Sequence, residues 1–231
     1  MFFYQPHILT GAHHLDEEES RHAAKVLRLT TGSEITVTDG KGHLVTAAIA
    51  ALHGRRCDLE IRATQKINRR PFEIGMAIAP TKNMDRTEWF VEKAVELGIE
   101  HIHFFHSRYS ERKAINPERL QKKAVSAMKQ SQQAWLPVIT DMVPLGKLIA
   151  SASADLKFIA FVDATNPKHL MQLAEPNKKY LVLIGPEGDF SSEELNAAMD
   201  AGFLKVSLGP NRLRTETAGV MACAILNLVN H

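Results

Sequence analysis

The sequence predicts an α/β protein in which a mainly parallel sheet, covered by helices on both faces, follows a smaller β-rich domain. Three observations lead to this fold class. Short strand-like segments fill the first 71 residues, apolar strand-like segments alternate with helical ones after Pro71, and a chain of 231 residues has room for two modest domains. Strands that alternate with helices favour parallel pairing, because each helix carries the chain back across the sheet.

The N-terminal domain is expected to span residues 1–71. Ser33–Gly40 alternates apolar with polar residues and ends in a turn, and two further strand-like segments follow at His43–Leu52 and Cys57–Thr64. One helical stretch, Glu17–Leu29, precedes them. This mixture predicts a small β-barrel-like domain whose size is near the lower limit for independent folding.

The C-terminal domain is expected to span residues 72–231. Its last helix is apolar almost all the way round, so burying it requires an additional surface, and we expect a homodimer. The other helices follow from apolar periodicity and from proline and glycine at their ends. The predicted strands are Phe72–Pro80, Ile99–Phe105, Lys157–Asp163, Tyr180–Gly185 and Leu204–Gly209, and the predicted helices are Arg86–Leu97, Pro117–Trp135, Ser192–Ala201 and one from about Thr215.

Composition and charge leave several partners open. The formal net charge of +2 neither requires nor excludes a nucleic-acid partner, and the whole excess lies within residues 1–71. The basic residues from Arg55 to Arg70 are either a solvated hairpin with its linker or a face that contacts phosphates. Cys57 and Cys223 lack the spacing of a disulfide framework or a zinc site. The chain opens without a basic secretory signal and no run approaches the ~18 apolar residues of a membrane span, so we expect a cytoplasmic protein.

The first candidate site is a turn that follows a buried strand. Leu181–Ile184 runs directly into Gly185-Pro186-Glu187-Gly188, and Ser191 with Glu194 forms a capping-box pattern that starts the next helix. A phosphate is the first ligand to consider at a helix N-terminus. However, the stretch fits neither the dinucleotide-binding nor the P-loop pattern, and its two carboxylates, Glu187 and Asp189, would repel a polyphosphate.

A second turn repeats this arrangement. Val206–Gly219 contains an apolar strand, Gly209-Pro210, a loop with Arg212 and Arg214, and a helix that opens at Thr215. Two neighbouring strands that each end in Gly-Pro would meet at the C-terminal edge of the sheet, where open α/β sheets bind ligands. Carboxylates in place of a phosphate cradle favour a cationic ligand without phosphates, and S-adenosylmethionine fits that description. The alternative is a purely structural pair of turns.

These two stretches carry a family resemblance. "LIGPEGDFSSEE" and "VSLGPNRLRTETA" closely resemble the signature motifs of the SPOUT-class ribosomal RNA small subunit methyltransferase E family, the 16S rRNA uridine-N3 methyltransferases. "HAAKVLRLTTGSEITVTDGKG" is similar to the PUA-like RNA-binding domain of that family. The central segments "KAVELGIEHIHFFHSRYSER" and "AMKQSQQAWLP" extend the resemblance over the whole chain. The chain departs from the usual family pattern at Lys129, Gln133, Asp189 and Arg212.

The resemblance implies a deep trefoil knot in the C-terminal domain, S-adenosylmethionine as the cofactor and an active site shared between two subunits. The implied reaction is methylation of N3 of a uridine in 16S rRNA of the small ribosomal subunit, the decoding-region uridine conventionally numbered 1498. By match to the motifs, the cofactor-binding residues would be Leu183, Ile184, Gly185, Glu187, Gly188, Leu208, Gly209, Leu213, Thr215, Thr217 and Ala218.

Arg214 and Glu216 are the candidate catalytic residues. We expect Arg214 to orient the base or stabilise its charge and Glu216 to organise the loop; the alternative is that the two side chains only pair with each other. Uridine N3 must be unpaired or flipped out to react. The candidate RNA-binding residues are Lys25, Arg28, Arg55 and Arg56 in the N-terminal domain and Lys82 and Arg108 in the C-terminal one.

The sequence allows three other interpretations. One is a metal site, because closely spaced histidines can be metal ligands, as at His101, His103 and His106. An ordinary strand explains them, however, and no metal site is expected. A different RNA target for a related knotted methyltransferase stays open, as does an RNA-binding assembly factor without catalysis. Binding of S-adenosylmethionine would count against the last of these.

Overall fold

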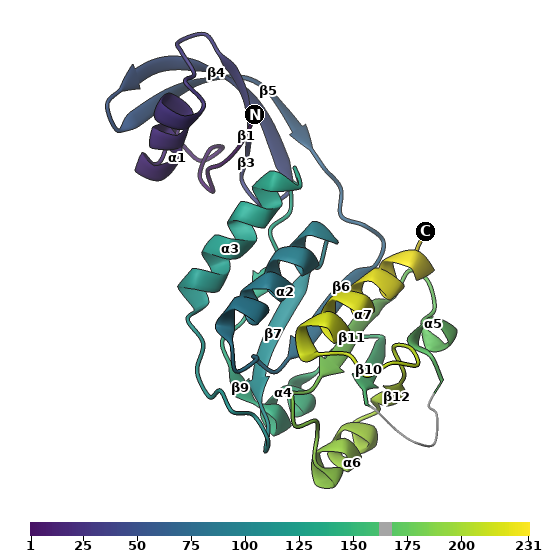
Figure 1. The fold of residues 1–231 in the computed structure, drawn as a ribbon. Coiled ribbons are helices and arrows are strands. Elements are labelled where there is room, and N and C mark those ends of the chain that lie inside the picture. The colour runs from purple at the N-terminus through teal and green to yellow at the C-terminus, as the bar shows by residue number, and fades with distance from the viewer. Residues whose placement is uncertain (162–167) are drawn as a thin grey trace. The chain divides into compact units, whose positions relative to one another are not determined.

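The computed structural model describes residues 1–161 and 168–231, which form two compact units (Figure 1). The first unit combines Met1–Arg69 with Val125–Leu136, and the second combines Arg70–Ala124 with Pro137–His231. The first unit therefore joins the N-terminal residues to a stretch from the middle of the chain. None of the helices in the described ranges is long and apolar enough to cross a membrane.

The first unit is built on a five-stranded sheet with the order β1-β3-β4-β5-β2. β1 is parallel to β3, and the remaining neighbours are antiparallel. One face of the sheet supplies a core that includes Phe3, Ile35, Val37 and Val45. The strands are β1 (Phe2–Tyr4), β2 (His14–Leu15), β3 (Glu34–Thr38), β4 (His43–His53) and β5 (Arg56–Lys66).

The predicted helix Glu17–Leu29 is wrong in its second half. α1 (Glu17–Arg21) begins after Asp16, whose side chain accepts the Glu19 N–H, and then gives way to a π-helical turn, η1 (His22–Val26). Arg28 follows with a positive φ of 54°. After the wider turn and this change of direction, Leu27 and Leu29 pack against the core.

The stretch from the middle of the chain packs onto a turn of the first unit. The Leu136 N–H donates to the Gly40 carbonyl, and the Trp135 ring lies where a side chain on Gly42 would stand. The Arg69 guanidinium covers the same ring at 4.0 Å. These contacts need a sharp change of direction, so α3 (Pro117–Gln130) ends before the predicted Trp135 and Gln132 adopts a φ of 56°.

The second unit contains a parallel sheet with the order β12-β10-β11-β6-β7-β8, and β9 also pairs with β7. Every pair in it is parallel, which confirms the mainly parallel sheet. Of the predicted strand Lys157–Asp163, Val162 and Asp163 lie outside the described residues. The strands are β6 (Glu73–Ile78), β7 (His101–His106), β8 (Val138–Ile139), β9 (Val143–Pro144), β10 (Leu156–Ala160), β11 (Lys179–Ile184) and β12 (Leu204–Val206).

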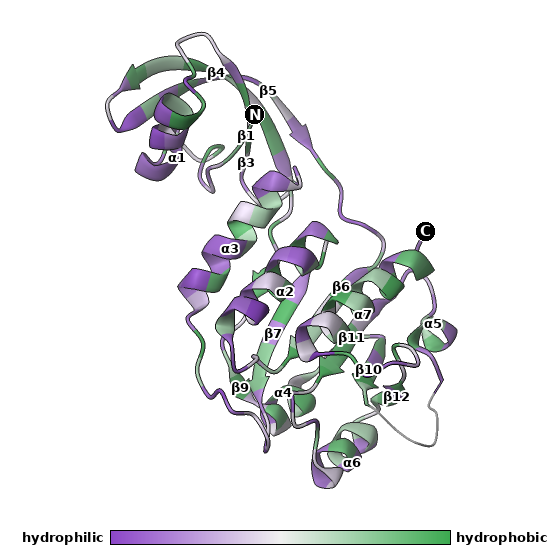
Figure 2. Cartoon of the chain, in the orientation of Figure 1, coloured by the Kyte–Doolittle hydropathy of each residue, from purple (hydrophilic) through white to green (hydrophobic). Residues whose placement is uncertain are grey.

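Helices cover both faces of this sheet, as expected (Figure 1). Leu181 and Leu183 of β11 pack with α4 and α6, whereas Ile78 of β6 points to the face covered by α7. Hydrophobic residues accordingly run along α7, and the outer sides of α2 and α3 are hydrophilic (Figure 2). The helices that lie wholly within this unit are α2 (Met84–Glu96), α4 (Leu145–Ser151), α5 (Leu170–Leu173), α6 (Ser192–Asp200) and α7 (Thr215–Val229).

α2 and α7 approach each other closely at Gly219. A Cβ atom there would lie 2.5 Å from the Phe90 ring and 3.2 Å from Ile78. Both side chains are fully or almost fully buried, so neither has room to move aside. Glycine at position 219 therefore sets the distance between the two helices.

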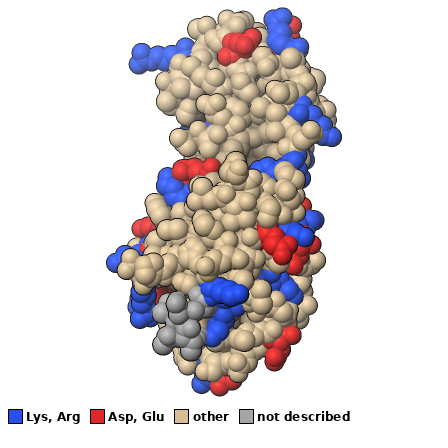
Figure 3. Space-filling model, turned by 90° about the vertical axis from the view of Figure 1, so that its right-hand side faces the viewer, with Lys and Arg blue, Asp and Glu red and all other residues tan. Residues whose placement is uncertain are grey.

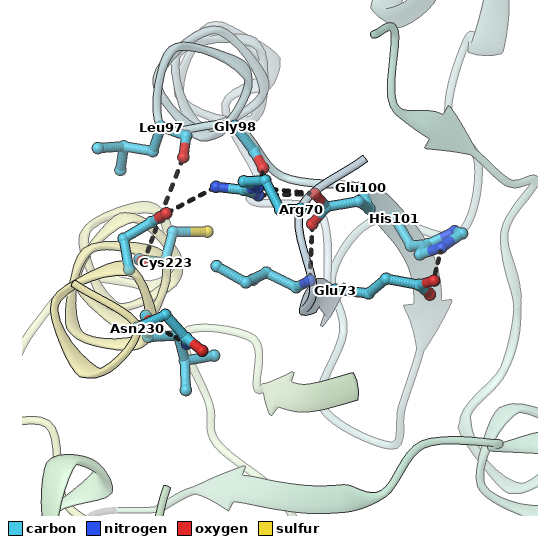
Figure 4. A network of polar contacts seen from close by, with 11 residues as sticks. Arg70, Glu73, Leu97, Gly98, Glu100, His101, Cys223 and Asn230 are labelled. Carbon is cyan, nitrogen blue, oxygen red and sulfur yellow. Dashed lines mark hydrogen bonds and ion pairs between the residues drawn. The ribbon is translucent and has the colours of Figure 1, made fainter. Parts of the chain in front are cut away.

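A polar network fastens the far end of α7 to the sheet (Figure 4). The Arg70 guanidinium donates to Glu100 Oε1 at 2.7 Å, to the Gly98 carbonyl and to Asn227 Oδ1 at 2.8 Å. Glu100 Oε2 in turn accepts the Ile74 N–H at 2.7 Å. Because the Glu100 side chain is mostly buried, removing the cation would leave a desolvated carboxylate.

We predict that Arg70→Ala lowers the free energy of unfolding by about 2–4 kcal/mol, because it leaves Glu100 without its cation. Equilibrium urea unfolding followed by circular dichroism measures the change. Lys178→Ala, which removes an exposed pair with Glu175, is the control and should cost less than about 0.5 kcal/mol. Equal midpoints for the two variants would contradict the prediction.

Candidate active site

A cavity of about 520 Å³ lies at the C-terminal edge of the parallel sheet in the second unit. The loop after β11 and the loop after β12 form most of its wall, so the two Gly-Pro turns meet in one site as the sequence predicted. The two strands are not neighbours, however, because β10 pairs with both of them. The lining residues are Arg86, Ala160, Phe161, Ile184, Gly185, Pro186, Glu187, Asp189, Val206, Ser207, Leu208, Gly209, Pro210, Asn211, Arg212, Leu213, Arg214, Thr215 and Ala218.

Most of the predicted cofactor-binding residues line this cavity, but three do not. Leu183 is fully buried on the opposite face of the sheet, among the residues that contact α4 and α6. Gly188 lies against Tyr109, where an added Cβ would be 2.8 Å from the tyrosine Cβ. Thr217 is half-buried in the first turn of α7 and is absent from the lining.

The loop after β11 is held by its own caps and by the start of α7. The predicted capping box of α6 is present: the Glu194 N–H donates to Ser191 Oγ at 3.2 Å, and the Ser191 N–H donates to Glu194 Oε2 at 2.9 Å. Thr215 Oγ1 donates to the Gly185 carbonyl at 3.0 Å. Since Thr215 opens α7, this bond ties the two Gly-Pro loops together.

Glu187 connects the cavity to a third loop. Its Oε1 atom accepts the backbone N–H of Lys82 at 3.1 Å, between β6 and α2. Arg112 also holds this loop, because its guanidinium donates to the carbonyls of Thr81 and Lys82. The acidic residue between the two glycines thus fixes loop geometry in addition to placing a carboxylate at the cavity wall.

The two candidate catalytic residues have different surroundings. Arg214 is exposed and lines the cavity, and its side chain makes no hydrogen bond or ion pair with any residue in the described ranges. Glu216 is buried, and its Oε1 atom lies 3.8 Å from Arg86 Nε of α2. Its Oε2 atom has no hydrogen-bond partner among the described residues. Glu216 is therefore paired with Arg86 and not with Arg214.

Arg86 is the charged lining residue that the sequence did not single out. It lies in the first turn of α2, and from the sequence it was expected only to begin a helix. Only its contact across to α7 marks it as part of the site, and that contact joins positions far apart in the chain. Asp189, Arg212, Ser207 and Phe161 also line the cavity without having been predicted as ligand contacts.

The candidate RNA-binding side chains are all exposed but differ in their partners. Arg55 and Arg56 pair with Glu17 and Asp58, whereas no partner in the described ranges is found for Lys25 or Arg28. In the second unit, Lys82 pairs with Glu111 and Arg108 pairs with Glu193. On the face drawn in Figure 3, Lys and Arg side chains stand in separate groups among neutral residues. A second cavity, of about 410 Å³, is lined by Lys82, Glu111, Arg112, Lys113 and Ala114.

No group of three metal-ligating side chains occurs in the described part of the chain. His101 and His103 do lie on one face of β7, as predicted, with parallel rings whose centroids are 6.0 Å apart. Burial and the neighbouring His101 lower the pKa of His103, which favours its neutral form. Burial also raises the pKa of the Cys223 thiol, so this cysteine has no features of a nucleophile.

Comparison with known proteins agrees with this architecture. The RNA methyltransferase domain family matches residues 68–227, and the RNA methyltransferase PUA domain family matches residues 15–62. A ribosomal RNA small subunit methyltransferase E from Aquifex aeolicus is 30% identical over 219 residues, which cover 92% of each chain. Its counterpart from Buchnera aphidicola is 27% identical over 92% of this chain and 86% of that protein.

Solved structures extend the match to the fold. A probable rRNA methyltransferase from Porphyromonas gingivalis is 38% identical, with a TM-score of 0.94 over 99% of this chain and 98% of that one. A ribosomal RNA small subunit methyltransferase E from Neisseria gonorrhoeae, solved with S-adenosyl methionine, is 27% identical, with a TM-score of 0.89 over 99% and 97%.

The parallel sheet, its cavity and the PUA match together define the class of RNA methyltransferases with an α/β fold and a PUA domain. Within that class, the chain belongs to the ribosomal RNA small subunit methyltransferase E family.

We predict that Glu187→Ala speeds hydrogen exchange of the Lys82 amide several-fold, since the lost hydrogen bond is worth about 1 kcal/mol. Glu187→Gln keeps an acceptor oxygen and is the matched control, with exchange close to that of the unmodified protein. Amide exchange measured by NMR distinguishes the two. If Glu187→Ala leaves the Lys82 amide equally protected, the carboxylate does not hold the loop.

Proposed function

We propose that the protein transfers a methyl group from S-adenosylmethionine to N3 of a uridine in 16S rRNA. The observation that carries the proposal is the cavity between the two Gly-Pro loops, which combines close backbone approach with carboxylates and no phosphate cradle. The Neisseria gonorrhoeae relative, solved with S-adenosyl methionine, supports the choice of cofactor.

The residues at the cavity suit this cofactor. A volume of about 520 Å³ lies in the range of small-molecule sites. Apolar walls from Ile184, Leu208 and Leu213 suit an adenine ring, and the backbone at Gly185 and Gly209 offers hydrogen-bonding groups to its edge and to the ribose. The carboxylates of Glu187 and Asp189 suit the positive charge of the ligand.

The chemistry requires alignment more than activation. The bound cofactor would supply an activated methyl group: the N3–carbon bond forms as the carbon–sulfur bond breaks, sulfur keeps the electron pair and the N3 proton passes to water. Positioning of the reacting atoms in line supplies much of the rate enhancement. Arg214, exposed at the cavity wall, would orient the uracil ring or stabilise its negative charge.

The RNA target follows from the family. We propose the decoding-region uridine conventionally numbered 1498 in the small ribosomal subunit, which also implies a cytoplasmic location. The PUA domain would hold the surrounding RNA by its shape and phosphates, with Lys25, Arg28, Arg55 and Arg56 as contacts, and Lys82 and Arg108 would do so near the cavity. A different RNA target and a non-catalytic assembly factor are the two alternatives that the experiment below separates.

We further propose that the chain from β11 to α7 forms a deep trefoil knot, that the sheet of the first unit closes as a barrel and that the protein is a homodimer. Support for the dimer comes from α7. Met221 and Leu228 are seven residues apart on one side of this helix and are 39% and 64% exposed. A second subunit on this side would cover both of them.

The central prediction is that small subunits from a strain lacking this gene gain one N3-methyluridine when incubated with the protein and labelled S-adenosylmethionine. Mass spectrometry of the 16S rRNA identifies the nucleotide, and calorimetry measures cofactor binding separately. Arg214→Ala is expected to lower the transfer rate constant about 10²-fold, whereas Lys178→Ala should leave it unchanged. Cofactor binding without transfer to 16S rRNA would leave a methyltransferase with a different RNA target, and the loss of both binding and transfer would leave the assembly factor.

We predict that light scattering gives the mass of a dimer and that Leu228→Glu gives a monomer, since the variant buries a charge in the proposed interface. Leu204→Glu, at a comparably exposed leucine of β12, is the control and should remain dimeric. A monomeric unmodified protein at the concentration of the methylation assay would refute the dimer.

A further inference from the structure

We propose that Arg86 is a second catalytic residue, which stabilises the negative charge that the uracil ring acquires as N3 loses its proton, and that Glu216 holds Arg86 in place. The inference rests on the proposed function. It assigns roles to two side chains that meet at the cavity from different helices, α2 and α7.

The helix packing fixes where Arg86 can stand. Arg86 and Phe90 are four residues apart on one side of α2, and Glu216 and Gly219 are three residues apart on one side of α7. The contact of Phe90 with Gly219 therefore brings Arg86 to Glu216 one turn away along each helix. Arg86 also reaches the cavity, so the helix contact places a guanidinium at the site.

Glu216 has the properties of an anchor for that guanidinium. Its side chain is 9% exposed, while that of Arg86 is 40% exposed. A carboxylate that is buried at this level requires a cation or several donors, yet its Oε2 atom has no partner among the described residues. The buried carboxylate of Glu216 therefore attracts the Arg86 guanidinium and holds it at this wall of the cavity. Glu216 acts through Arg86 as a positioning residue.

A fixed cation is what the reaction needs. When the N3 proton leaves to water, the negative charge spreads over N3 and the two ring oxygens, and a guanidinium can donate to such an anion with two N–H groups. A group that is already in place stabilises developing charge without reorganisation. The side chains of Arg212 and Arg214 are exposed and make no hydrogen bond or ion pair with the described residues, so a ligand would have to order them first.

The test compares Arg86→Ala with the unmodified protein in the methylation assay on small subunits. We expect the rate constant of transfer to fall about 10²-fold while calorimetry gives an unchanged affinity for S-adenosylmethionine. Arg86→Lys keeps the positive charge but not the two parallel N–H donors, so its transfer rate constant should fall less than that of Arg86→Ala. Lys93→Ala, which removes a cation from the other end of α2 away from the cavity, is the matched control.

A substrate with a more acidic N3 distinguishes charge stabilisation from a structural role, because a structural defect would lower the transfer rate equally on both substrates. Small subunits reconstituted with 5-fluorouridine in the 16S rRNA ionise at N3 at lower pH, so the deficit of Arg86→Ala should shrink at least tenfold on them. On ordinary uridine the rate of this variant should keep rising at a pH where the unmodified protein has levelled off. Glu216→Gln should show the same two effects in weaker form, since it loosens the placement of Arg86.

Three results would overturn the inference. A weaker affinity for S-adenosylmethionine with an unchanged transfer rate constant would make Arg86 a cofactor ligand. An equal deficit on uridine and on 5-fluorouridine would make its role structural. An unmodified protein that binds the cofactor but methylates no uridine N3 would instead refute the proposed function, and the inference with it.

Discussion

The contact between α2 and α7 at Gly219 is the constraint on which the second unit depends. Because no side chain fits between Gly219 and Phe90, the two helices lie close enough for residues on their neighbouring turns to meet. One end of α7 then reaches the cavity, where Thr215 bonds the first Gly-Pro loop. The other end is tied by Asn227 to Arg70 and through it to the start of β6. A single helix is thus tied to loops at both the C-terminal and the N-terminal ends of the strands.

The cavity combines anchored charges with exposed ones. Glu187 and Glu216 are each held by a named partner, the backbone of one loop in the first case and the guanidinium of Arg86 in the second. Arg212 and Arg214 stand in the open. This division suits a ligand that is itself charged at several points: fixed groups define the geometry before binding, and the exposed arginines adapt to the ligand once it is present.

The local pattern carried much of the architecture. The alternation of apolar strands and helices after Pro71 predicted the parallel sheet, and Ser191 with Glu194 predicted the start of α6, because strand periodicity and helix capping depend on neighbours in the chain. The helical stretch after Asp16 was predicted too long, because the chain forms a π-helical turn there and then packs Leu27 and Leu29 against the core. That packing depends on residues distant in the chain. α3 was likewise cut short by the packing of Trp135 on Gly42.

By itself, the sequence determined that two Gly-Pro turns stand at the same edge of the sheet, because every parallel strand ends there. It also determined that carboxylates rather than a phosphate cradle line the turn after β11. Only the tertiary structure decided that β10 separates the two strands, that Glu187 reaches the backbone of Lys82 and that Glu216 pairs with Arg86. These contacts join positions distant in the chain, and their distances are set by packed side chains such as Phe90 on Gly219, which no local pattern encodes.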